Sequence, residues 1–400
     1  MKIGHYMPGM WRHGGIASYI QRVSTAQMQA GHSVVYFDSL PHALSTGHES
    51  SLVFVRDAHD LHAQARARDV DILHAHVALP GPFPRGIPVI RTVHVHTPYC
   101  PSGTKYLRRQ GAPCERAYSV AGCAWGHLID RCGSRRPRNI IADIRQTRGE
   151  LVTLRDIPAI TVSTFLRKQM IRSGYRPDLL HVLHLPSPEV GAYGPSPYDG
   201  TPHFVFLGRL VPQKGVDWLL RALQHIRTPI HVDIAGDGYQ EADLRVLADR
   251  LGVADRVSFH GWVGEEDAAR LIASARALLV PSVWHEPGCT VAFEAMANER
   301  AIIAGRVGGI PEIVLHGENG LLVDPNDTVG LARAIERLAE DYTLAQRLGE
   351  TGRQRVATMF TLNDHIDNLL QLYGLYVSPR PSIARITSIS PSLQFERKEC

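Results

Sequence analysis

The sequence of 400 residues has no long hydrophobic run, few cysteines and little net charge. No apolar stretch approaches the roughly 20 residues that cross a bilayer, and residues 1–6 lack the apolar core of a secretory signal. Six cysteines are too few for a disulfide scaffold. A net charge of +4 comes with no nucleic-acid-binding signature. We therefore expect a cytoplasmic protein with reduced thiols and no nucleic-acid partner.

The composition is that of an ordinary globular protein, 44% apolar and 20% charged, and the length suits two domains. Short β-branched segments alternate with amphipathic stretches, which predicts parallel sheets with helices on both faces. The first series has a helix at 15–30 and strands at 2–6, 33–38, 71–74 and 88–93. The second has helices at 216–226 and 242–251 and strands at 203–207, 230–235, 256–260, 277–280, 301–304 and 320–323. Both halves are predicted to be doubly wound α/β domains.

The domain boundary is predicted from proline and glycine, which crowd residues 186–197 and interrupt helices and strands there. We assign residues 1–185 to an N-terminal domain, 186–202 to a linker and 203–360 to a C-terminal domain. After Tyr376 the composition shifts to Ser, Pro and Arg without periodicity, so 377–400 is expected to be a poorly ordered tail.

A basic turn follows the first strand of the second domain. Gly208 ends this strand, and Arg209 and Lys214 flank the turn before the next helix. A diphosphate leaving group gains negative charge in the transition state, and two positioned cations would stabilise it without a metal. The alternative is a solvated basic loop.

Two carboxylates lie farther along the chain. Glu286 belongs to a loop, residues 284–290, and Glu294 to the apolar helix that follows. A carboxylate in an apolar helix needs a polar partner, for which vicinal sugar hydroxyls are suitable. A third feature, Gly14-Gly15 before the first helix, would let backbone amides approach an anion, although plain turn chemistry explains it equally.

These motifs together resemble a family 4 retaining glycosyltransferase of GT-B architecture over residues 1 to about 375. The resemblance is carried by the following segments: Gly14-Gly15, residues 71–76, residues 92–94, Gly208-Arg209-Leu210 with Lys214-Gly215, Glu286 to Glu294, and residues 308–312. It implies two Rossmann-like domains that face each other across a cleft. It also implies that residues 361–376 form a helix crossing back to the N-terminal domain.

The resemblance further implies roles for individual residues. Glu294 would hold the ribose, Glu286 would touch the donor sugar, and backbone at Trp262 and Val263 would read the base. Arg209 and Lys214 would bind the diphosphate, and His94 would lie beside the anomeric carbon. The implied activity is metal-independent, front-face transfer of a hexosyl group from a nucleoside diphosphate sugar to a hydroxyl acceptor, as in polysaccharide or glycoconjugate biosynthesis.

The sequence does not specify the donor sugar, the base or the acceptor. Gly288 and Cys289, ahead of Thr290, depart from the family pattern, which has a bulky residue and then glycine there; this puts the donor sugar in doubt. UDP-, GDP- and ADP-sugars are not distinguished, because base contacts in this fold are mainly backbone. On the acceptor side, a segment at about 98–138 resembles an insertion found in some of these transferases, with Lys105 and Tyr106 near the acceptor's entry.

The insertion has two further features. It holds the cysteines Cys100, Cys114, Cys123 and Cys132, which are either packed thiols or, with histidines, a structural zinc site, although close Cys-x-x-Cys pairs are missing. Residues 105–148 also hold ten Lys or Arg against three acids. This predicts either a solvated basic face or peripheral contact with anionic lipid at the inner face of the membrane.

Other interpretations remain open at this point. His5, His74 and His76 are candidate ligands, but scattered histidines are mostly structural or surface groups. A GT-B nucleotide-sugar epimerase would need further acid/base carboxylates, and a catalytically silent nucleotide-sugar-binding subunit would bind donor without turnover. The acceptor and the oligomeric state are not specified by the sequence.

Overall fold

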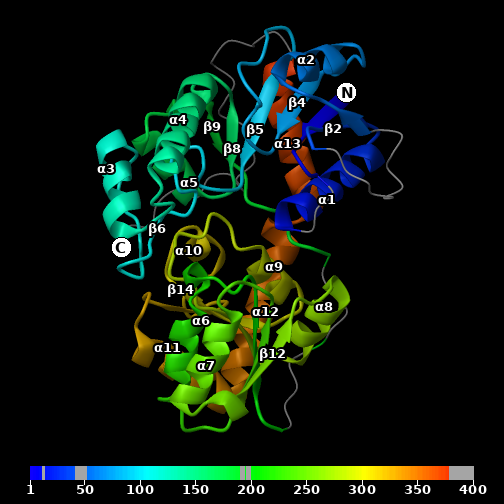
Figure 1. The fold of residues 1–400 in the computed structure, drawn as a ribbon. Helices are drawn as coiled ribbons and strands as arrows, with labels where there is room; N and C mark the ends of the chain where they lie inside the picture. The colour runs from blue at the N-terminus through cyan, green and yellow to red at the C-terminus, as the bar shows by residue number, and fades with distance from the viewer. Residues whose placement is uncertain (11–13, 41–51, 190–193, 195–199, 378–400) are drawn as a thin grey trace. The chain divides into compact units, whose positions relative to one another are not determined.

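The computed structural model describes residues 1–10, 14–40, 52–189, 194 and 200–377, which form two compact units (Figure 1). The first unit contains residues 1–103 and 141–185 and the chain from Leu362 onward. The second contains residues 104–140 and 186–361. Each unit is built around its own parallel sheet.

The first unit has a seven-stranded parallel sheet in the order β3-β2-β1-β4-β5-β8-β9. Its strands are β1 Lys2–Tyr6, β2 Ser33–Asp38, β3 Leu52–Phe54, β4 Ile72–Ala75, β5 Val89–Val93, β8 Ala159–Thr161 and β9 Leu180–Val182. Its helices are α1 Gly15–Gln29, α2 Ala58–Arg66, α4 Pro137–Leu154, which starts in the second unit, α5 Thr164–Arg172, the short η3 Pro177–Leu179 and α13 Leu362–Val377. After β1 the chain forms β2 and β3 on one side of β1. It then returns and forms β4, β5, β8 and β9 on the other side of β1. The strand order therefore reverses between β1 and β4.

The core of the first unit follows from the burial of these strands. Strand β4 is buried along its whole length, as expected for a central parallel strand covered on both faces. Tyr6, Phe37, Leu61 and Leu73 belong to one hydrophobic cluster between sheet and helices. The final helix α13 packs on α1, and Figure 1 shows the two side by side.

The second unit repeats this plan with six parallel strands in the order β12-β11-β10-β13-β14-β15. Its strands are β10 His203–Leu207, β11 His231–Ala235, β12 Val257–Gly261, β13 Ala277–Val280, β14 Ala301–Gly305 and β15 Leu321–Val323. Its helices are η4 Pro212–Lys214, α6 Val216–Leu223, α7 Glu241–Leu251, η5 Ala254–Arg256, α8 Glu265–Ser274, α9 Thr290–Ala297, α10 Ile310–Ile313, α11 Thr328–Glu340 and α12 Tyr342–Met359. Here the strand order reverses between β10 and β13, so the loops after these two strands are neighbours.

Residues 104–140 belong to the second unit, whereas the sequence analysis places an insertion at about 98–138 within the N-terminal domain. This segment, which we call the insertion, forms the small antiparallel pair β6 Tyr106–Leu107 and β7 Ala112–Pro113, followed by α3 Val120–Trp125 and the π-helical turn η2 Gly126–Asp130. The Tyr106 side chain joins the hydrophobic core of the second unit. Burial of an aromatic ring of this kind contributes roughly 1.5–3 kcal/mol, which anchors the insertion there.

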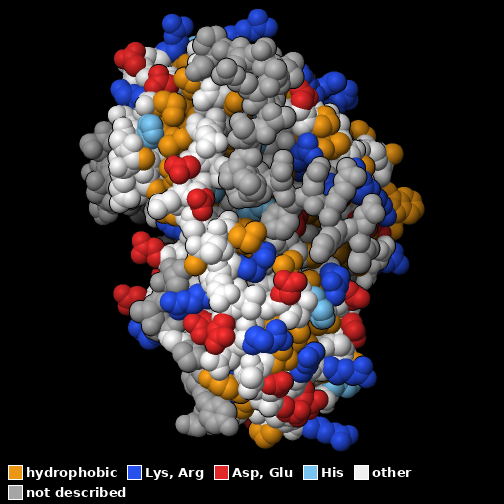
Figure 2. Space-filling view, turned by 180° about the vertical axis from the view of Figure 1, so that it is seen from behind, with side chains coloured by type: hydrophobic (Ala, Val, Ile, Leu, Met, Phe, Trp, Pro, Cys, Tyr) orange, Lys and Arg blue, Asp and Glu red, His pale blue; other side chains and the backbone are white. Residues whose placement is uncertain are grey.

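The doubly wound α/β organisation predicted for both halves is confirmed, and most predicted strand bounds agree within one residue. The predicted tail falls outside the described residues apart from Val377, which ends α13, and so does part of the predicted linker. In the described part of the chain, no helix combines the length and hydropathy that a membrane crossing requires. On the face in Figure 2, Lys and Arg side chains are interspersed with Asp and Glu.

Candidate active site

The structure brings together a lysine and a glutamate from the two loops at the switch point of the second unit. Lys214 ends the turn after β10, and Glu286 lies in the loop after β13. Lys214 Nζ lies 2.6 Å from Glu286 Oε1, and the same oxygen accepts a 2.6 Å hydrogen bond from Ser282 Oγ. The Glu286 side chain is 4% exposed and that of Lys214 is 20% exposed. The two residues predicted at this site are therefore a nearly buried ion pair at the carboxyl edge of the sheet.

Glu286 is held in its charged form by this arrangement. Burial by itself favours the neutral acid, but the Lys214 charge and the hydrogen bonds from Lys214, Ser282 and Trp284 outweigh it and keep the pKa of Glu286 below its usual range. Lys214 has three ammonium hydrogens and gives one to Glu286, so it retains donors for an anionic ligand.

Glycines allow the loops of this site to approach one another. Gly215 has φ +67°, and a Cβ there would lie 1.9 Å from the carbonyl oxygen of Pro281. Gly308 has φ +58°, and a Cβ there would lie 2.3 Å from the carbonyl oxygen of Glu286. The neighbouring amide of Gly309 donates to that carbonyl at 2.8 Å. Side chains at these positions would push the loops that carry Lys214 and Glu286 apart.

Gly308→Ala is expected to destabilise the protein more than Gly317→Ala. Gly317 also has a left-handed φ, +80°, but a Cβ there meets nothing within 4 Å. Gly317→Ala therefore carries only the backbone strain, about 1–2 kcal/mol, whereas Gly308→Ala adds an overpacking cost of about 1–3 kcal/mol. Urea unfolding of the two variants measures the difference, and equal losses would contradict a tightly packed loop at Glu286.

Arg209 and Gly208 directly follow β10, at the same edge of the sheet. Arg209 is exposed, and among the described residues its guanidinium has no hydrogen-bond or ion-pair partner. Trp262 and Val263 follow β12 at this edge, and the Trp262 side chain is 61% exposed. The predicted diphosphate and base groups thus follow β10 and β12 at one edge of the sheet, with β11 between these strands, and Arg209 and Trp262 are exposed there.

Glu294 lies in α9, whose other side chains are largely buried and apolar, and it is half-buried. Gly288 and Cys289 precede this helix, and Thr290 begins it and is exposed. Cys289 is buried, and burial together with the nearby Glu286 charge raises the pKa of its thiol to about 12. The residue that departs from the family pattern is therefore a neutral packed thiol.

In the first unit, Gly14 precedes α1 and Gly15 begins it, and both are exposed. His94 follows β5 and is half-buried. Burial, the charge of Arg91 and His365 lower the pKa of His94 to about 3, so its imidazole is neutral at physiological pH. His94 Nε2 lies 3.3 Å from Nδ1 of His76.

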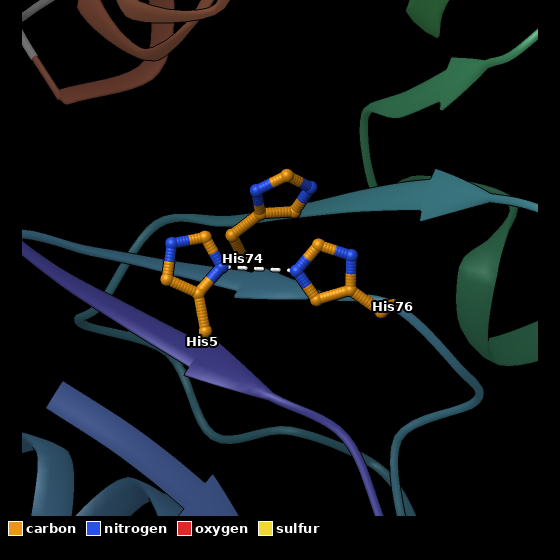
Figure 3. A group of neighbouring side chains, drawn as sticks. All are labelled: His5, His74 and His76. Carbon is orange, nitrogen blue, oxygen red and sulfur yellow. Dashed lines mark hydrogen bonds between the residues drawn. The ribbon is translucent and has the colours of Figure 1, made fainter. Parts of the chain in front are cut away.

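The histidines that the sequence analysis treats as scattered form a cluster at the switch point of the first unit (Figure 3). His5 of β1 pairs in register with His74 of β4, and His76 follows β4 immediately. All three are buried, and burial lowers their pKa values, that of His5 to about 4. In the sequence, these histidines lie at or just after the ends of two predicted strands. The sequence does not show that the two strands are neighbours in the sheet, so it does not predict the cluster.

Two expectations of the sequence analysis concern the insertion. Lys105 is buried and its Nζ donates to the carbonyl oxygen of Arg116 at 2.5 Å, and Tyr106 packs in the core, so in this structure both side chains hold the insertion in place. The cysteine zinc site stays a prediction. Within the described residues His5, His74 and His76 are the single group of three or more possible metal ligands, and Cys100, Cys114, Cys123 and Cys132 form no disulfide.

Comparisons with known proteins agree with this architecture. Residues 195–355 match the family described as "Glycosyl transferases group 1". The lipopolysaccharide core biosynthesis glycosyltransferase LpsD of Rhizobium meliloti (strain 1021) is 35% identical over 176 residues, which are 44% of this chain and 50% of LpsD. The matched region spans about half the length of the curated relatives.

Similar solved structures cover nearly the whole chain. Sucrose-phosphate synthase from Thermosynechococcus elongatus has a TM-score of 0.72 at 21% identity, over 93% of this chain and 98% of that protein. HepE of Anabaena in complex with UDP has a TM-score of 0.70 at 18% identity, over 94% of this chain and 100% of that protein, and it has also been solved with UDP-glucose.

The fold is therefore GT-B, as the motifs predicted. The match to the group 1 glycosyltransferase family covers residues 195–355 of this fold.

Proposed function

We propose that this protein is a retaining glycosyltransferase that moves a hexosyl group from a nucleoside diphosphate sugar to a hydroxyl acceptor. The observation that carries the proposal is the Lys214–Glu286 ion pair at the switch point of the second unit, with Arg209 exposed in the same loop as Lys214. The group 1 domain match and the UDP complexes of HepE, which has the same fold, support a nucleotide-sugar donor.

The second unit would bind the donor. Arg209 and the remaining Lys214 hydrogens would contact the diphosphate and stabilise the charge that develops as the anomeric carbon–oxygen bond breaks. Glu294 would bind the ribose hydroxyls, and Glu286 would accept a hydrogen bond from the donor sugar. The acceptor oxygen attacks the anomeric carbon on the face from which the diphosphate leaves, and its proton passes to the departing phosphate oxygen. Two cations in these positions serve this chemistry without a metal.

Two alternative functions, a nucleotide-sugar epimerase and a silent binding subunit, predict different results from glycosyl transfer when the protein is incubated with donor. An epimerase would convert the nucleotide sugar with no acceptor present. A silent binding subunit would bind donor with neither hydrolysis nor transfer.

Nucleotide binding tests the proposal directly. We expect one of UDP, GDP or ADP to raise the melting temperature equally with and without EDTA. Ligand at 100 times its dissociation constant adds about 2.7 kcal/mol of stability. Glu294→Ala should abolish the shift. Donor hydrolysis is then measured with the matching sugar nucleotides, and a melting temperature that none of the three nucleotides changes would refute the donor site.

We also propose peripheral contact with anionic membranes through the insertion. Trp125, Leu128 and Ile129 are 56%, 49% and 38% exposed on α3 and η2. Exposed arginines of the same segment accompany them: Arg108, Arg109, Arg116, Arg131, Arg135, Arg136 and Arg138. An aromatic ring flanked by arginines suits a negatively charged interface, where each cation contributes about 1 kcal/mol.

Vesicle sedimentation measures this contact. The protein should bind vesicles that contain phosphatidylserine and not those of phosphatidylcholine alone. Trp125→Ser should weaken binding severalfold, whereas Trp262→Ser, at an equally exposed tryptophan of the second unit, should leave it unchanged. Equal binding by both variants and the unchanged protein would argue against the insertion.

A further inference from the structure

The hairpin of the insertion, strands β6 and β7, contacts loops of the second unit. The guanidinium of Arg108 lies 5.7 Å from the ring centroid of Tyr239. The side-chain nitrogen of Asn326 donates a 3.0 Å hydrogen bond to the carbonyl oxygen of Gly111. Tyr239 follows β11 and Asn326 follows β15, so both belong to loops at the carboxyl edge of the sheet. The hairpin is therefore attached to the edge of the second unit that carries the proposed donor groups.

A further contact of the insertion reaches the loop of Glu286. Glu115 follows β7, and its Oε1 lies 2.8 Å from Nε2 of His285, the residue directly before Glu286. At this distance the ring nitrogen must carry a proton, because a carboxylate oxygen only accepts and a lone pair on the nitrogen would repel it. The Glu115 side chain is 70% exposed and that of His285 is 7% exposed. An exposed carboxylate of the insertion thus holds a buried ring of the site loop.

The main chain at Glu115 is itself fixed within the insertion. On one side, the amide of Cys114 donates to the carbonyl oxygen of Lys105 at 2.7 Å. On the other side, Nζ of the buried Lys105 donates to the carbonyl oxygen of Arg116 at 2.5 Å. The guanidinium of Arg116 also pairs with the carboxylate of Asp130 in η2 at 2.5 Å. The fold of the insertion therefore determines where Glu115 lies.

The loop that receives this contact is also held by the second unit. Before His285, the amide of Val283 donates to the carbonyl oxygen of Gln213 at 3.0 Å. After it, the carbonyl oxygen of Glu286 accepts from the amide of Gly309 at 2.8 Å. The Glu115 contact falls between these two hydrogen bonds and comes from a different segment of the chain. The insertion therefore helps to fix the main chain at the point where Glu286 leaves it.

We propose that Glu115 is a positioning residue of the proposed donor site, which acts through His285 on the main chain that carries Glu286. The insertion is then a part of the donor site. The catalytic consequence rests on the proposed function, whereas the attachment of the loop does not. A displacement of about 1 Å near the reacting atoms can lower a rate roughly 100-fold. An exposed ion pair contributes at most about 1 kcal/mol to stability, so the effect on catalysis is separable from folding.

Hydrogen exchange measures the attachment without any ligand. In the full-length protein, Glu115→Ala should speed exchange severalfold in peptides that contain the amides of Val283 and Gly309, whose hydrogen bonds hold the loop. Glu115→Gln keeps an oxygen that accepts from His285, and its exchange should stay near that of the unchanged protein. Unchanged exchange in Glu115→Ala would overturn the proposal.

Arg109→Ala is the matched control for these measurements. Arg109 is exposed in the same insertion, and its side chain has no partner among the described residues. Its replacement should leave exchange in the loop unchanged. Equal acceleration by Arg109→Ala and Glu115→Ala would mean that any change in the insertion loosens the loop, and it would refute a specific part for Glu115.

Kinetics connect the attachment to the reaction. With UDP-glucose as probe, Glu115→Ala should lower kcat for donor hydrolysis roughly 10- to 100-fold while the melting temperature stays nearly the same. KM should change less, because Arg209 and Glu294, which would hold the nucleotide, are unaltered. Glu115→Gln should restore kcat, and Arg109→Ala should not change it.

The outcomes separate this proposal from the proposed function. Absence of hydrolysis by the unchanged protein would count against the proposed function with this donor, and hydrogen exchange would still decide whether Glu115 holds the loop. Faster exchange in Glu115→Ala with an unaltered kcat would overturn the positioning role.

A double variant tests the route through His285. His285→Leu removes the ring that Glu115 contacts, so adding Glu115→Ala to it should not speed exchange at Gly309 any further. Two residues that act through one contact show such non-additivity. Additive effects would show that Glu115 reaches the loop by another route and would refute the part assigned to His285.

Discussion

Replacing Lys214 by methionine is expected to lower the free energy of unfolding by about 3–5 kcal/mol, because it leaves the carboxylate of Glu286 buried without its cation. The pair is separated by 2.6 Å and the Glu286 side chain is 4% exposed, so water cannot replace the lost ammonium fully. Urea denaturation at neutral pH measures the loss. A loss below 1 kcal/mol would mean that the pair behaves as a surface ion pair.

The pH dependence of this variant has a definite sign. In the unchanged protein Glu286 has a lowered pKa, so its contribution to stability is present above the pKa of the unfolded chain and is lost as pH falls through the folded pKa. Without Lys214, burial dominates and raises the pKa. The folded state then holds the proton more tightly than the unfolded state, and stability should fall as pH rises from about 4.3 toward neutral.

A double variant separates charge burial from loss of packing. Lys214→Met with Glu286→Gln removes both charges and keeps the shapes similar. It should recover much of the stability lost in Lys214→Met and show no fall with rising pH, although it should be inactive. If the double variant is as unstable as the single one, the loss arises from packing of the lysine stem.

Arg209→Met is expected to reduce the rate constant of transfer by about 100- to 1000-fold with little change in stability. Removing one preorganised group that stabilises developing charge typically has an effect of this size. Arg209 is exposed and has no ion-pair or hydrogen-bond partner among the described residues, so folding does not depend on it. Turnover at saturating donor and urea denaturation measure the two quantities separately.

The control for this prediction is Arg221→Met. Arg221 is also exposed in the second unit, but it lies in the last turn of α6, away from the loop after β10. Its replacement should leave turnover unchanged. If both variants turn over at the normal rate, the diphosphate does not contact Arg209.

Much of the fold is predictable from the sequence because its signals are local. Strand β10, Gly208 at its end and the turn to α6 follow from a β-branched run, a glycine and an amphipathic segment, and the structure has them at these positions. Glu294 likewise falls in the apolar helix that the pattern predicts. Alternation of such elements was sufficient to predict two doubly wound sheets.

Other features could not be predicted, because they depend on which strands become neighbours. His5 and His74 lie 69 residues apart and meet only because β4 pairs with β1. Tyr373 of α13, which hydrogen-bonds His74, comes from the far end of the chain. The insertion is a similar case, since Tyr106 is amphipathic and its local sequence does not specify which core it enters.

The sequence by itself determined the elements, the family resemblance, the two cations and one carboxylate on loops after strands, and a second carboxylate in an apolar helix. Periodicity, turn chemistry and residue type act over a few residues, so they can be read in order along the chain. Tertiary structure alone decided that Lys214 and Glu286 form a nearly buried pair and that His5, His74 and His76 form a buried cluster. The pKa of a group and its hydrogen-bond partners both depend on how deeply it is buried and on which groups lie near it. Burial and these distances are defined only when distant segments of the chain pack together.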